Sequence, residues 1–373
     1  MRYLIAGGGT GGHIYPALAV CKGLLGADPA AEILYVGTRR GFEAELVPRE
    51  GIRFEVIDAA GIMGKSPIAA AKGAARALLG TFQAAGILRR FRPHAALGTG
   101  GYVSGPVILV AALAGVPCAI QEQNAVPGAT NRLLARFVRE VFVPFEGTRA
   151  HFPKTARCVL TGNPIRPEIM QADREDGAQR LGLDPKKKTL FVFGGSRGAR
   201  RIIEVALEML AERMLPEDVQ VLLTSGREYA SWVSDRLSGL GIDVSRPGNV
   251  IFKPYLFQIE YAMAASDLLV GRAGGMTVSE VLARGLPSIL VPSPNVANNH
   301  QLYNARAASR TGGAVLVREQ DLTATRLAGL IRDLTGDRDA LRQMSEKAKA
   351  AGRPFATGDI VEHLKALASR NPK

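Results

Sequence analysis

The sequence predicts an α/β protein made of two Rossmann-like domains, and two observations support this. The chain has 373 residues, about twice the usual length of one domain. Both halves also open in the same way, with a short apolar run, a glycine loop and a helical stretch. Further apolar runs alternate with helical stretches in each half, which indicates βαβ units and parallel sheets.

The expected elements follow this plan along the chain. In the first half, we expect a helix at 14–26 and strands at 2–6, 33–36, 54–57, 95–97, 117–121 and 141–143. In the second half, we expect strands at 189–193, 220–224, 250–253, 268–271 and 288–291. Two prolines and a glycine make Thr161–Pro167 the predicted linker. We therefore expect domains at 1–162 and 163–340, and a helical tail at 341–373 that crosses back to the first domain.

Charge and composition limit the partners and the compartment. The formal net charge is +13, which implies an anionic partner such as phosphate groups, a membrane surface or nucleic acid. Cys21, Cys118 and Cys158 are far apart, which fits a reducing compartment and no disulfide or metal framework. The N-terminus lacks signal-peptide features, and the longest apolar run, 106–120, is too short to span a bilayer. We expect a cytoplasmic protein whose membrane contact is peripheral.

The first glycine loop, Gly7–His13, contains G-x-G-x-x-G between a strand and a helix. Its glycines allow close approach of a ligand, and the helix N-terminus attracts an anion. A dinucleotide site also needs an acid about 20 residues further on, at the end of the second strand. That strand instead ends in Gly37–Arg40. The missing acid argues against NAD, whereas the arginines leave an NADP-dependent oxidoreductase as an alternative.

His13 is the first candidate catalytic residue. Its position at the start of a helix, beside the anion loop, favours a neutral ring that can accept a proton. The alternative is a histidine that only caps or packs against the helix.

Two features follow the third predicted strand. Residues 59–66 fit a relaxed P-loop pattern, but the first glycine is replaced by alanine and Pro67 follows at once, so we favour a basic turn. Residues 62–92 then combine apolar residues at helical spacing with basic ones. This stretch fits a helix on an anionic membrane surface or a core-facing helix with a solvated basic face.

Polar residues gather after three other predicted strands. Gly98–Tyr102 is a second glycine loop, and Gln121–Asn124 and Asn131 offer hydrogen bonds suited to sugar hydroxyls. In the second half, the N–H groups of the loop that opens Gly271–Glu280 suit a diphosphate, and Glu280 suits the two hydroxyls of a ribose. The amide-rich segment Asn298–Gln301 is a further candidate wall of the site.

Together these motifs resemble the MurG family, the undecaprenyldiphospho-muramoylpentapeptide β-N-acetylglucosaminyltransferases of peptidoglycan synthesis. The resemblance covers nearly the whole chain, and its motifs occur in the family's order. They are Gly7–His13, Gly98–Tyr102, Glu122–Asn124, Gly162–Arg166, Gly194–Arg200 and Gly275–Glu280.

The resemblance implies a GT-B fold, in which two Rossmann-like domains face each other across a cleft. It also implies inverting transfer of GlcNAc from UDP-GlcNAc to the C4 hydroxyl of MurNAc in lipid I, which gives lipid II. The expected location is the cytoplasmic face of the bacterial plasma membrane, where residues 62–92 contact anionic lipid. No nucleic-acid partner is expected.

The resemblance further implies roles for single residues. His13 and Glu122 are the two candidates for the general base, and Tyr102 and Asn131 line the acceptor side. Leu256 meets the uracil through its backbone and Glu280 binds the ribose. The implied contacts of UDP-GlcNAc are Thr10, Gly11, Gly12, Asn124, Arg166, Ser196, Leu256, Gly275, Met276, Thr277, Glu280 and Gln301.

The chemistry expected of these residues needs no cofactor. Helix N-termini and Arg166 suit the charge that develops on the leaving UDP, and no acidic pair of the D-x-D type follows a strand, so no essential metal is expected. Within the same fold, a UDP-sugar 2-epimerase is the main alternative. A membrane adaptor without activity is the other, but it leaves the glycine loops without a role.

Overall fold

The computed structural model describes residues 1–59, 67–195, 198–244 and 248–370. The chain forms two compact units, unit 1 from Met1–Arg166 with Arg353–Lys373 and unit 2 from Pro167–Gly352. The sequence predicted boundaries after residues 162 and 340. The structure keeps residues 163–166 in unit 1, where Asn163 hydrogen-bonds to Gln121 and Gln123. It keeps residues 341–352 in unit 2.

Within the described residues, unit 1 contains a seven-stranded parallel sheet of order β3-β2-β1-β4-β5-β6-β7. The strand order reverses between β1 and β4, and in open α/β sheets ligands bind at the carboxyl ends of the strands on either side of such a reversal. All the strands expected in this half are present, and β7 was not predicted. The strands are β1 (Arg2–Gly7), β2 (Glu32–Gly37), β3 (Arg53–Val56), β4 (Ala95–Gly100), β5 (Cys118–Gln121), β6 (Glu140–Val143) and β7 (Cys158–Leu160).

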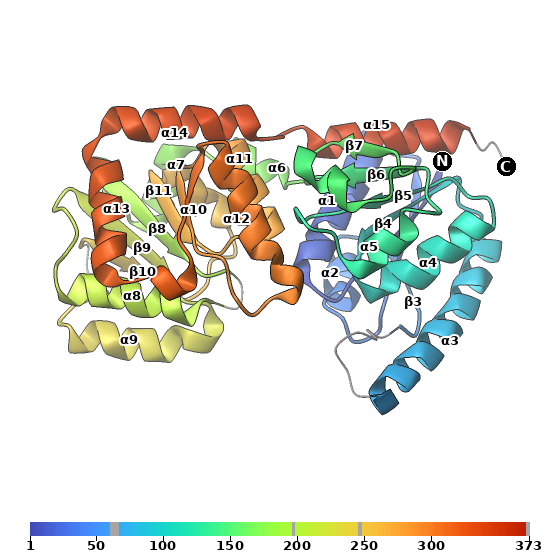
Figure 1. The fold of residues 1–373 in the computed structure, drawn as a ribbon, viewed down its shortest axis with the longest axis horizontal. Coiled ribbons are helices and arrows are strands. Elements are labelled where there is room, and N and C mark those ends of the chain that lie inside the picture. Colours follow the sequence, from blue (N-terminus) through green and yellow to red (C-terminus); the bar gives the residue numbers. More distant parts are fainter. Residues whose placement is uncertain (60–66, 196–197, 245–247, 371–373) are drawn as a thin grey trace. The chain divides into compact units, whose positions relative to one another are not determined.

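Successive side chains of β1 point to opposite faces of the sheet. Because these side chains are apolar, both faces are covered by helices and each face forms a buried cluster. Tyr3 and Ile5 pack with the first and last helices of the unit, whereas Leu4 and Ala6 pack on the opposite face. Figure 1 shows these layers. The helices are α1 (Gly11–Ala27), α2 (Glu43–Arg49), α3 (Pro67–Phe91), α4 (Gly101–Leu113), α5 (Ala129–Leu134), the 3₁₀ helix η1 (Glu146–His151) and α15 (Ala356–Ser369).

Unit 2 repeats the plan with a six-stranded parallel sheet among its described residues, of order β10-β9-β8-β11-β12-β13. Here the order reverses between β8 and β11. Every strand expected in this half is present, and β13 was not predicted. The strands are β8 (Lys188–Phe193), β9 (Val219–Thr224), β10 (Val250–Phe252), β11 (Leu268–Gly271), β12 (Ser288–Leu290) and β13 (Ala314–Leu316).

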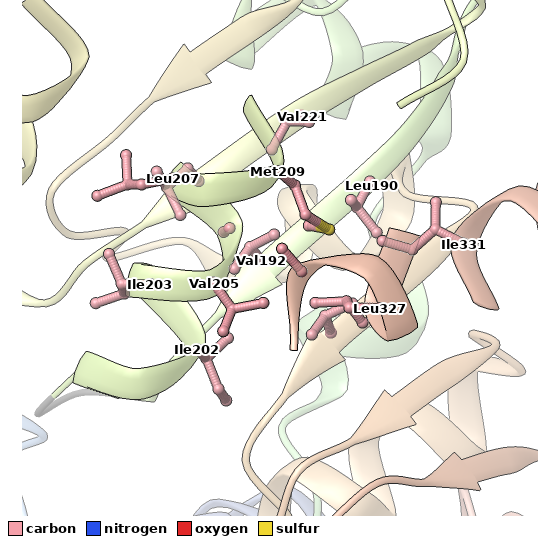
Figure 2. Close-up of a cluster of buried hydrophobic side chains, with 14 of the residues drawn as sticks. Leu190, Val192, Ile202, Ile203, Val205, Leu207, Met209, Val221, Leu327 and Ile331 are labelled. Atoms are coloured by element: carbon pink, nitrogen blue, oxygen red, sulfur yellow. The ribbon is translucent and has the colours of Figure 1, made fainter. Parts of the chain in front are cut away.

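One face of this second sheet is covered by a dense apolar cluster, shown in Figure 2. Leu190 and Val192 of the central strand meet Ile202 and Met209 of α8 and Leu327 of α13. The helices of unit 2 are α6 (Pro167–Gln171), α7 (Arg174–Leu181), α8 (Arg200–Ala211), α9 (Ala230–Gly239), α10 (Ile259–Ala265), α11 (Gly275–Arg284), α12 (His300–Arg310), α13 (Ala324–Gly336) and α14 (Arg338–Ala351). Its short 3₁₀ helices are η2 (Arg227–Tyr229), η3 (Ala297–Asn299) and η4 (Glu319–Asp321).

The C-terminal tail consists of two helices that belong to different units. Helix α14 packs against α11 of unit 2, whereas α15 packs against α1 of unit 1. Ile360, Leu364 and Leu367 of α15 are buried in the same cluster as Tyr3 of β1. The last helix is therefore part of the core of unit 1.

Helix α3 joins two kinds of surface. Its C-terminal half packs on the sheet through Ala84, Ile87, Leu88 and Phe91. Further toward its N-terminus, Leu78, Leu79 and Phe82 are 61%, 49% and 69% exposed. Among the side chains that the structure describes, the core-facing interpretation holds for the buried group of residues toward the C-terminus, and the exposed group faces solvent. Residues 60–66, which include most of the P-loop-like segment, lie outside the described residues. In the part of the chain described, no helix is both long and apolar enough to cross a membrane.

The three thiols give a test of this packing. Cys21 and Cys118 are buried in the core of unit 1, and burial raises the pKa of both, that of Cys118 to about 12. Cys158 is only partly buried, and burial raises the pKa of its thiol while the charge of Arg149 opposes that shift. Because the thiolate is the reactive form, we expect a disulfide reagent at neutral pH to label Cys158 slowly and the other two only after unfolding. Rapid labelling of all three in the native protein would contradict this packing.

Candidate functional site

The two glycine loops of unit 1 meet at the reversal of strand order. Gly101 has a φ of +77°, and a Cβ there would overlap the backbone carbonyl of Gly8. A Cβ on Gly7 would likewise overlap the hydroxyl of Thr99. Only glycine allows this backbone contact. The loops after β1 and β4 are therefore packed directly together, and they carry the residues around His13.

His13 lies in the first turn of α1, half-buried, with its ring against the second loop. Its Nδ1 lies 2.8 Å from Oε1 of Gln123 and 3.1 Å from the carbonyl oxygen of Thr99. The hydroxyl of Thr99 donates back to the carbonyl of His13 at 2.8 Å. A Cβ on Gly100 would lie 2.8 Å from Nδ1, so the ring needs glycine at that position. The histidine is thus held as an oriented group and does not cap the helix.

Glu122, the other candidate base, is 2% exposed and fully engaged by hydrogen-bond donors. Its Oε1 accepts from the backbone N–H groups of Gln123 and Asn124 at 3.0 and 2.9 Å, and from the amide of Asn124 at 3.2 Å. Its Oε2 accepts from the N–H of Gly128 at 3.1 Å and from Asn131 at 2.9 Å. This carboxylate organises the loop after β5.

A second buried carboxylate, which the sequence did not single out, supports the first glycine loop. Glu43 of α2 is fully buried and accepts from the N–H of Gly9 at 3.2 Å. It also accepts from the N–H and the hydroxyl of Thr38 at 3.1 and 2.8 Å. The only signal in the sequence was an acid shortly after β2. Since the N–H of Gly9 faces this carboxylate, that N–H does not serve an anionic ligand.

The other candidates of unit 1 lie at the same edge of its sheet. Thr10 precedes α1, which begins with Gly11 and Gly12, and Tyr102 of α4 lies beside Gly9. Asn124 follows β5 as part of the loop that Glu122 organises. Within the described residues, the Oδ1 of buried Asn131 has no hydrogen-bond partner. The structure thus brings these candidates together at the ends of β1, β4 and β5. Arg166 is the last residue of the first segment of unit 1.

In unit 2, the loop between β11 and α11 is fixed by two side chains that the sequence did not identify. Arg272 donates to the carbonyl of Val291 at 3.2 Å and pairs with Glu319. Asn304, fully buried, donates to the carbonyl of Ala273 at 3.0 Å. The helix begins after Gly274, which has no side chain that could accept a hydrogen bond from the first N–H groups of α11. The loop is therefore rigid before α11 begins.

Several donor-side candidates lie on α11 and α12, the helices of unit 2 that follow β11 and β12. Gly275, Met276 and Thr277 form the first turn of α11, and Glu280 lies one turn further, 9% exposed. Gln301 of α12 accepts from the N–H of Ser293 at 2.9 Å. Ser196 lies outside the described residues.

Leu256 follows β10 in a loop that carries an aromatic and cationic cluster. The rings of Tyr255 and Phe257 lie 4.9 Å apart, and Arg227 lies 4.9 and 5.4 Å from their centres. Cation–π contacts contribute about 0.5–1 kcal/mol at exposed sites. Leu256 therefore lies between two aromatic residues that both contact Arg227, one of which, Phe257, is largely exposed.

The described residues hold no group of three or more histidine, cysteine, aspartate or glutamate side chains placed to bind a metal. The candidate sites consist of an oriented imidazole in unit 1 and a helix N-terminus with polar residues in unit 2.

Two Rossmann-like units with glycine loops at the carboxyl edges of their sheets define the GT-B class of proteins. Residues 3–143 match the glycosyltransferase family 28 N-terminal domain, and residues 189–359 match the corresponding C-terminal domain. The chain belongs to glycosyltransferase family 28.

Known relatives agree with this assignment. A UDP-N-acetylglucosamine–N-acetylmuramyl-(pentapeptide) pyrophosphoryl-undecaprenol N-acetylglucosamine transferase of Moorella thermoacetica is 46% identical, over 97% of this chain and 98% of the relative. The crystal structure of Acinetobacter baumannii MurG superposes with a TM-score of 0.77 at 28% identity, covering 98% of this chain and 99% of that one. A UDP-GlcNAc 2-epimerase of Neisseria meningitidis shares the fold alone, with a TM-score of 0.69 at 16% identity over 98% of this chain and all of that one.

Glu122→Gln separates a structural carboxylate from a base. The amide replaces one acceptor oxygen with a donor that faces N–H groups, so we expect unfolding to become easier by about 1–3 kcal/mol. We expect the turnover rate to fall only as far as the loop after β5 becomes disordered. The acidic limb of the pH–rate profile should stay at the same pH as in the wild type. Denaturant unfolding and a pH–rate profile measure the two effects. An unchanged stability with turnover abolished would return Glu122 to the role of base.

Proposed function

We propose that this chain transfers N-acetylglucosamine from UDP-N-acetylglucosamine to the C4 hydroxyl of the N-acetylmuramyl unit of lipid I, forming lipid II with inversion at the anomeric carbon. The observation that carries the proposal is His13, an oriented imidazole at the strand reversal of unit 1. The name of the Moorella thermoacetica relative, which matches over nearly the whole chain, supports the choice of substrates.

The reaction is a single displacement. The acceptor oxygen forms a bond to C1 of the sugar while the bond from C1 to the diphosphate oxygen breaks, and UDP leaves with the electron pair. His13 takes the acceptor's hydroxyl proton on Nε2 as the new bond forms. Because attack occurs opposite the leaving group, the α-linked donor gives a β-linked product.

The donor is assigned to unit 2. The N–H groups at the start of α11, in Gly275, Met276 and Thr277, face the diphosphate and stabilise the charge that UDP gains. Glu280 accepts from the ribose hydroxyls, and the backbone of Leu256 meets the uracil. Ser196, Gln301 and Arg166 complete the proposed contacts, so that the charge of the leaving group is met without a metal or another cofactor.

The sugar and the acceptor are assigned to unit 1. Asn124 binds the donor sugar beside Thr10, Gly11 and Gly12, while Tyr102 and Asn131 line the acceptor side. The buried Oδ1 of Asn131 lacks a partner within the described residues, and its Nδ2 is held by Glu122 at 2.9 Å. Its orientation is thus set in advance by the loop after β5.

The membrane contact is assigned to α3. Leu78, Leu79 and Phe82 expose apolar surface, and Arg76, Arg89 and Arg90 of the same helix are exposed as well. Exposed apolar groups beside cations suit the boundary of an anionic lipid leaflet. The protein is therefore proposed to act as a peripheral protein at the cytoplasmic membrane face, where its lipid acceptor resides.

Transfer of labelled GlcNAc to a lipid I analogue tests the activity. We expect labelled lipid only when acceptor is present, with no loss of rate on treatment with a chelator. His13→Ala should lower kcat by about 10²–10⁴-fold, the usual contribution of a general base, while donor binding stays unchanged. The matched control is His151→Ala, an exposed histidine of η1.

Other outcomes of the same assay exclude the proposal. Release of UDP or free sugar without acceptor favours the epimerase or hydrolase alternative. Full activity of His13→Ala removes this residue as the base, and absence of UDP-GlcNAc binding removes the donor assignment in unit 2.

Vesicle sedimentation tests the membrane contact. The double variant Leu79→Ser/Phe82→Ser removes two exposed apolar side chains, so we expect binding to anionic vesicles to weaken by at least about tenfold. Leu240→Ser, at a partly exposed leucine of unit 2, is the control and should bind as the wild type does. Equal binding of both variants would place the membrane surface elsewhere.

A further inference from the structure

We propose that Gln123 is the positioning residue that selects the tautomer of His13, keeping the proton on Nδ1 so that Nε2 is the atom that accepts. The inference rests on the proposed role of His13 as the general base, and it gives Gln123, which the sequence grouped only with residues suited to sugar hydroxyls, a specific positioning function.

The partners of the ring determine where its proton lies. Nδ1 of His13 faces two oxygens, the carbonyl of Thr99 at 3.1 Å and Oε1 of Gln123 at 2.8 Å. A carbonyl oxygen and an amide oxygen only accept hydrogen bonds. Nδ1 must therefore donate, and the lone pair of a neutral ring resides on Nε2.

The orientation of the Gln123 amide is fixed by backbone carbonyls. Its Nε2 donates to the carbonyl of Thr99 at 2.7 Å and to that of Gln121 at 3.1 Å, and it also contacts the side-chain oxygen of Gln121. Rotating the amide by half a turn would place its oxygen against three acceptors. Because Gln123 is 2% exposed, water does not compensate such a reversal. Its oxygen therefore stays on the side of His13.

Two further amides hold Gln123 in place. Gln121 donates to the carbonyl of Glu122 at 2.8 Å and to Oδ1 of Asn163 at 2.7 Å. Asn163 in turn donates to the carbonyl of Gln123 at 3.0 Å. Each amide in this series donates to at least one backbone carbonyl, so none of them can be reversed alone. The ring of His13 is thus oriented by Gln123, and Gln123 is in turn held by Gln121 and Asn163.

The nearby carboxylates do not take this position. Those of Glu122 and Glu43 accept from other groups, and Tyr102 lies beside Gly9. Catalytic histidines are often oriented by a carboxylate, which also stabilises the imidazolium. Here a neutral amide orients the ring without adding negative charge. Gln123 therefore determines which nitrogen of the ring carries the proton, and it does not determine whether the ring is charged.

The tautomer is measurable in the wild-type protein without any assay of activity. The chain has five histidines, and a ring-¹⁵N-labelled sample gives separate signals for Nδ1 and Nε2. The His13→Gln spectrum identifies the signals of this residue. We expect a protonated Nδ1 and an unprotonated Nε2 above the titration of the ring. A protonated Nε2 would overturn the proposal, whatever the activity.

Gln123→Met then tests the cause, because methionine keeps the length and removes both amide atoms. We expect the signals of His13 to move toward a mixture of tautomers. We also expect kcat to fall by about 10–100-fold, part of the effect of losing the base, with the KM for UDP-GlcNAc unchanged within about twofold.

Gln220→Met is the matched control. Gln220 is a buried glutamine of β9 in unit 2, bonded to Asp184 and Thr189. Its loss should cost stability without changing the His13 tautomer. A wild-type tautomer in Gln123→Met would overturn the inference. If His13→Ala keeps full activity while the tautomer is as expected, the proposed base is wrong but the positioning contact stands. If Gln123→Met does not fold, a protonated Nε2 in the wild-type spectrum would still overturn the proposal.

Discussion

The backbone contact between the two glycine loops of unit 1 is the constraint on which the position of His13 depends. Gly101 meets the carbonyl of Gly8, and Gly100 lies against the ring of His13. Any side chain at these positions would separate the loops or displace the ring. Because β1 and β4 are neighbours in the sheet, this contact lies at the point where the strand order reverses. The fold thus brings a residue near the N-terminus against one almost ninety positions later.

Buried polar groups make this contact rigid. Glu43 lies beneath the first loop and Glu122 behind the loop after β5, and each is surrounded by N–H donors. A buried carboxylate without such donors would be strongly destabilising, whereas one that is fully bonded fixes every group around it. Unit 2 uses Arg272 and Asn304 in the same way around the start of α11. In both units, charged or amide side chains that are not proposed to touch substrate define the shape of the loops that do.

Much of the fold was predictable because central strands are continuous apolar runs. The two missed strands, β7 and β13, are three-residue edge strands that are only partly buried, so they give little periodic signal. The sequence also predicted that the candidate site residues lie in the loops that follow the strands. The role of Gln123 was not predictable, because it depends on where the carbonyl of Thr99 lies in space. Likewise, periodicity could not tell that α3 buries Ile87 and Phe91 and exposes Phe82.

The placement of α15 has a consequence for synthesis on the ribosome. Unit 1 consists of the first 166 residues together with a segment that begins at Arg353, and Ile360 and Leu364 fill its core beside α1. During translation, the N-terminal part therefore emerges with one face of α1 uncovered and stays incomplete while all of unit 2 is made. Domains are commonly completed in order from the N-terminus, but here the second unit can close before the first. A nascent chain stalled before residue 353 would expose apolar surface to chaperones, and termination before α15 would leave a protein with a complete unit 2 and an incomplete unit 1.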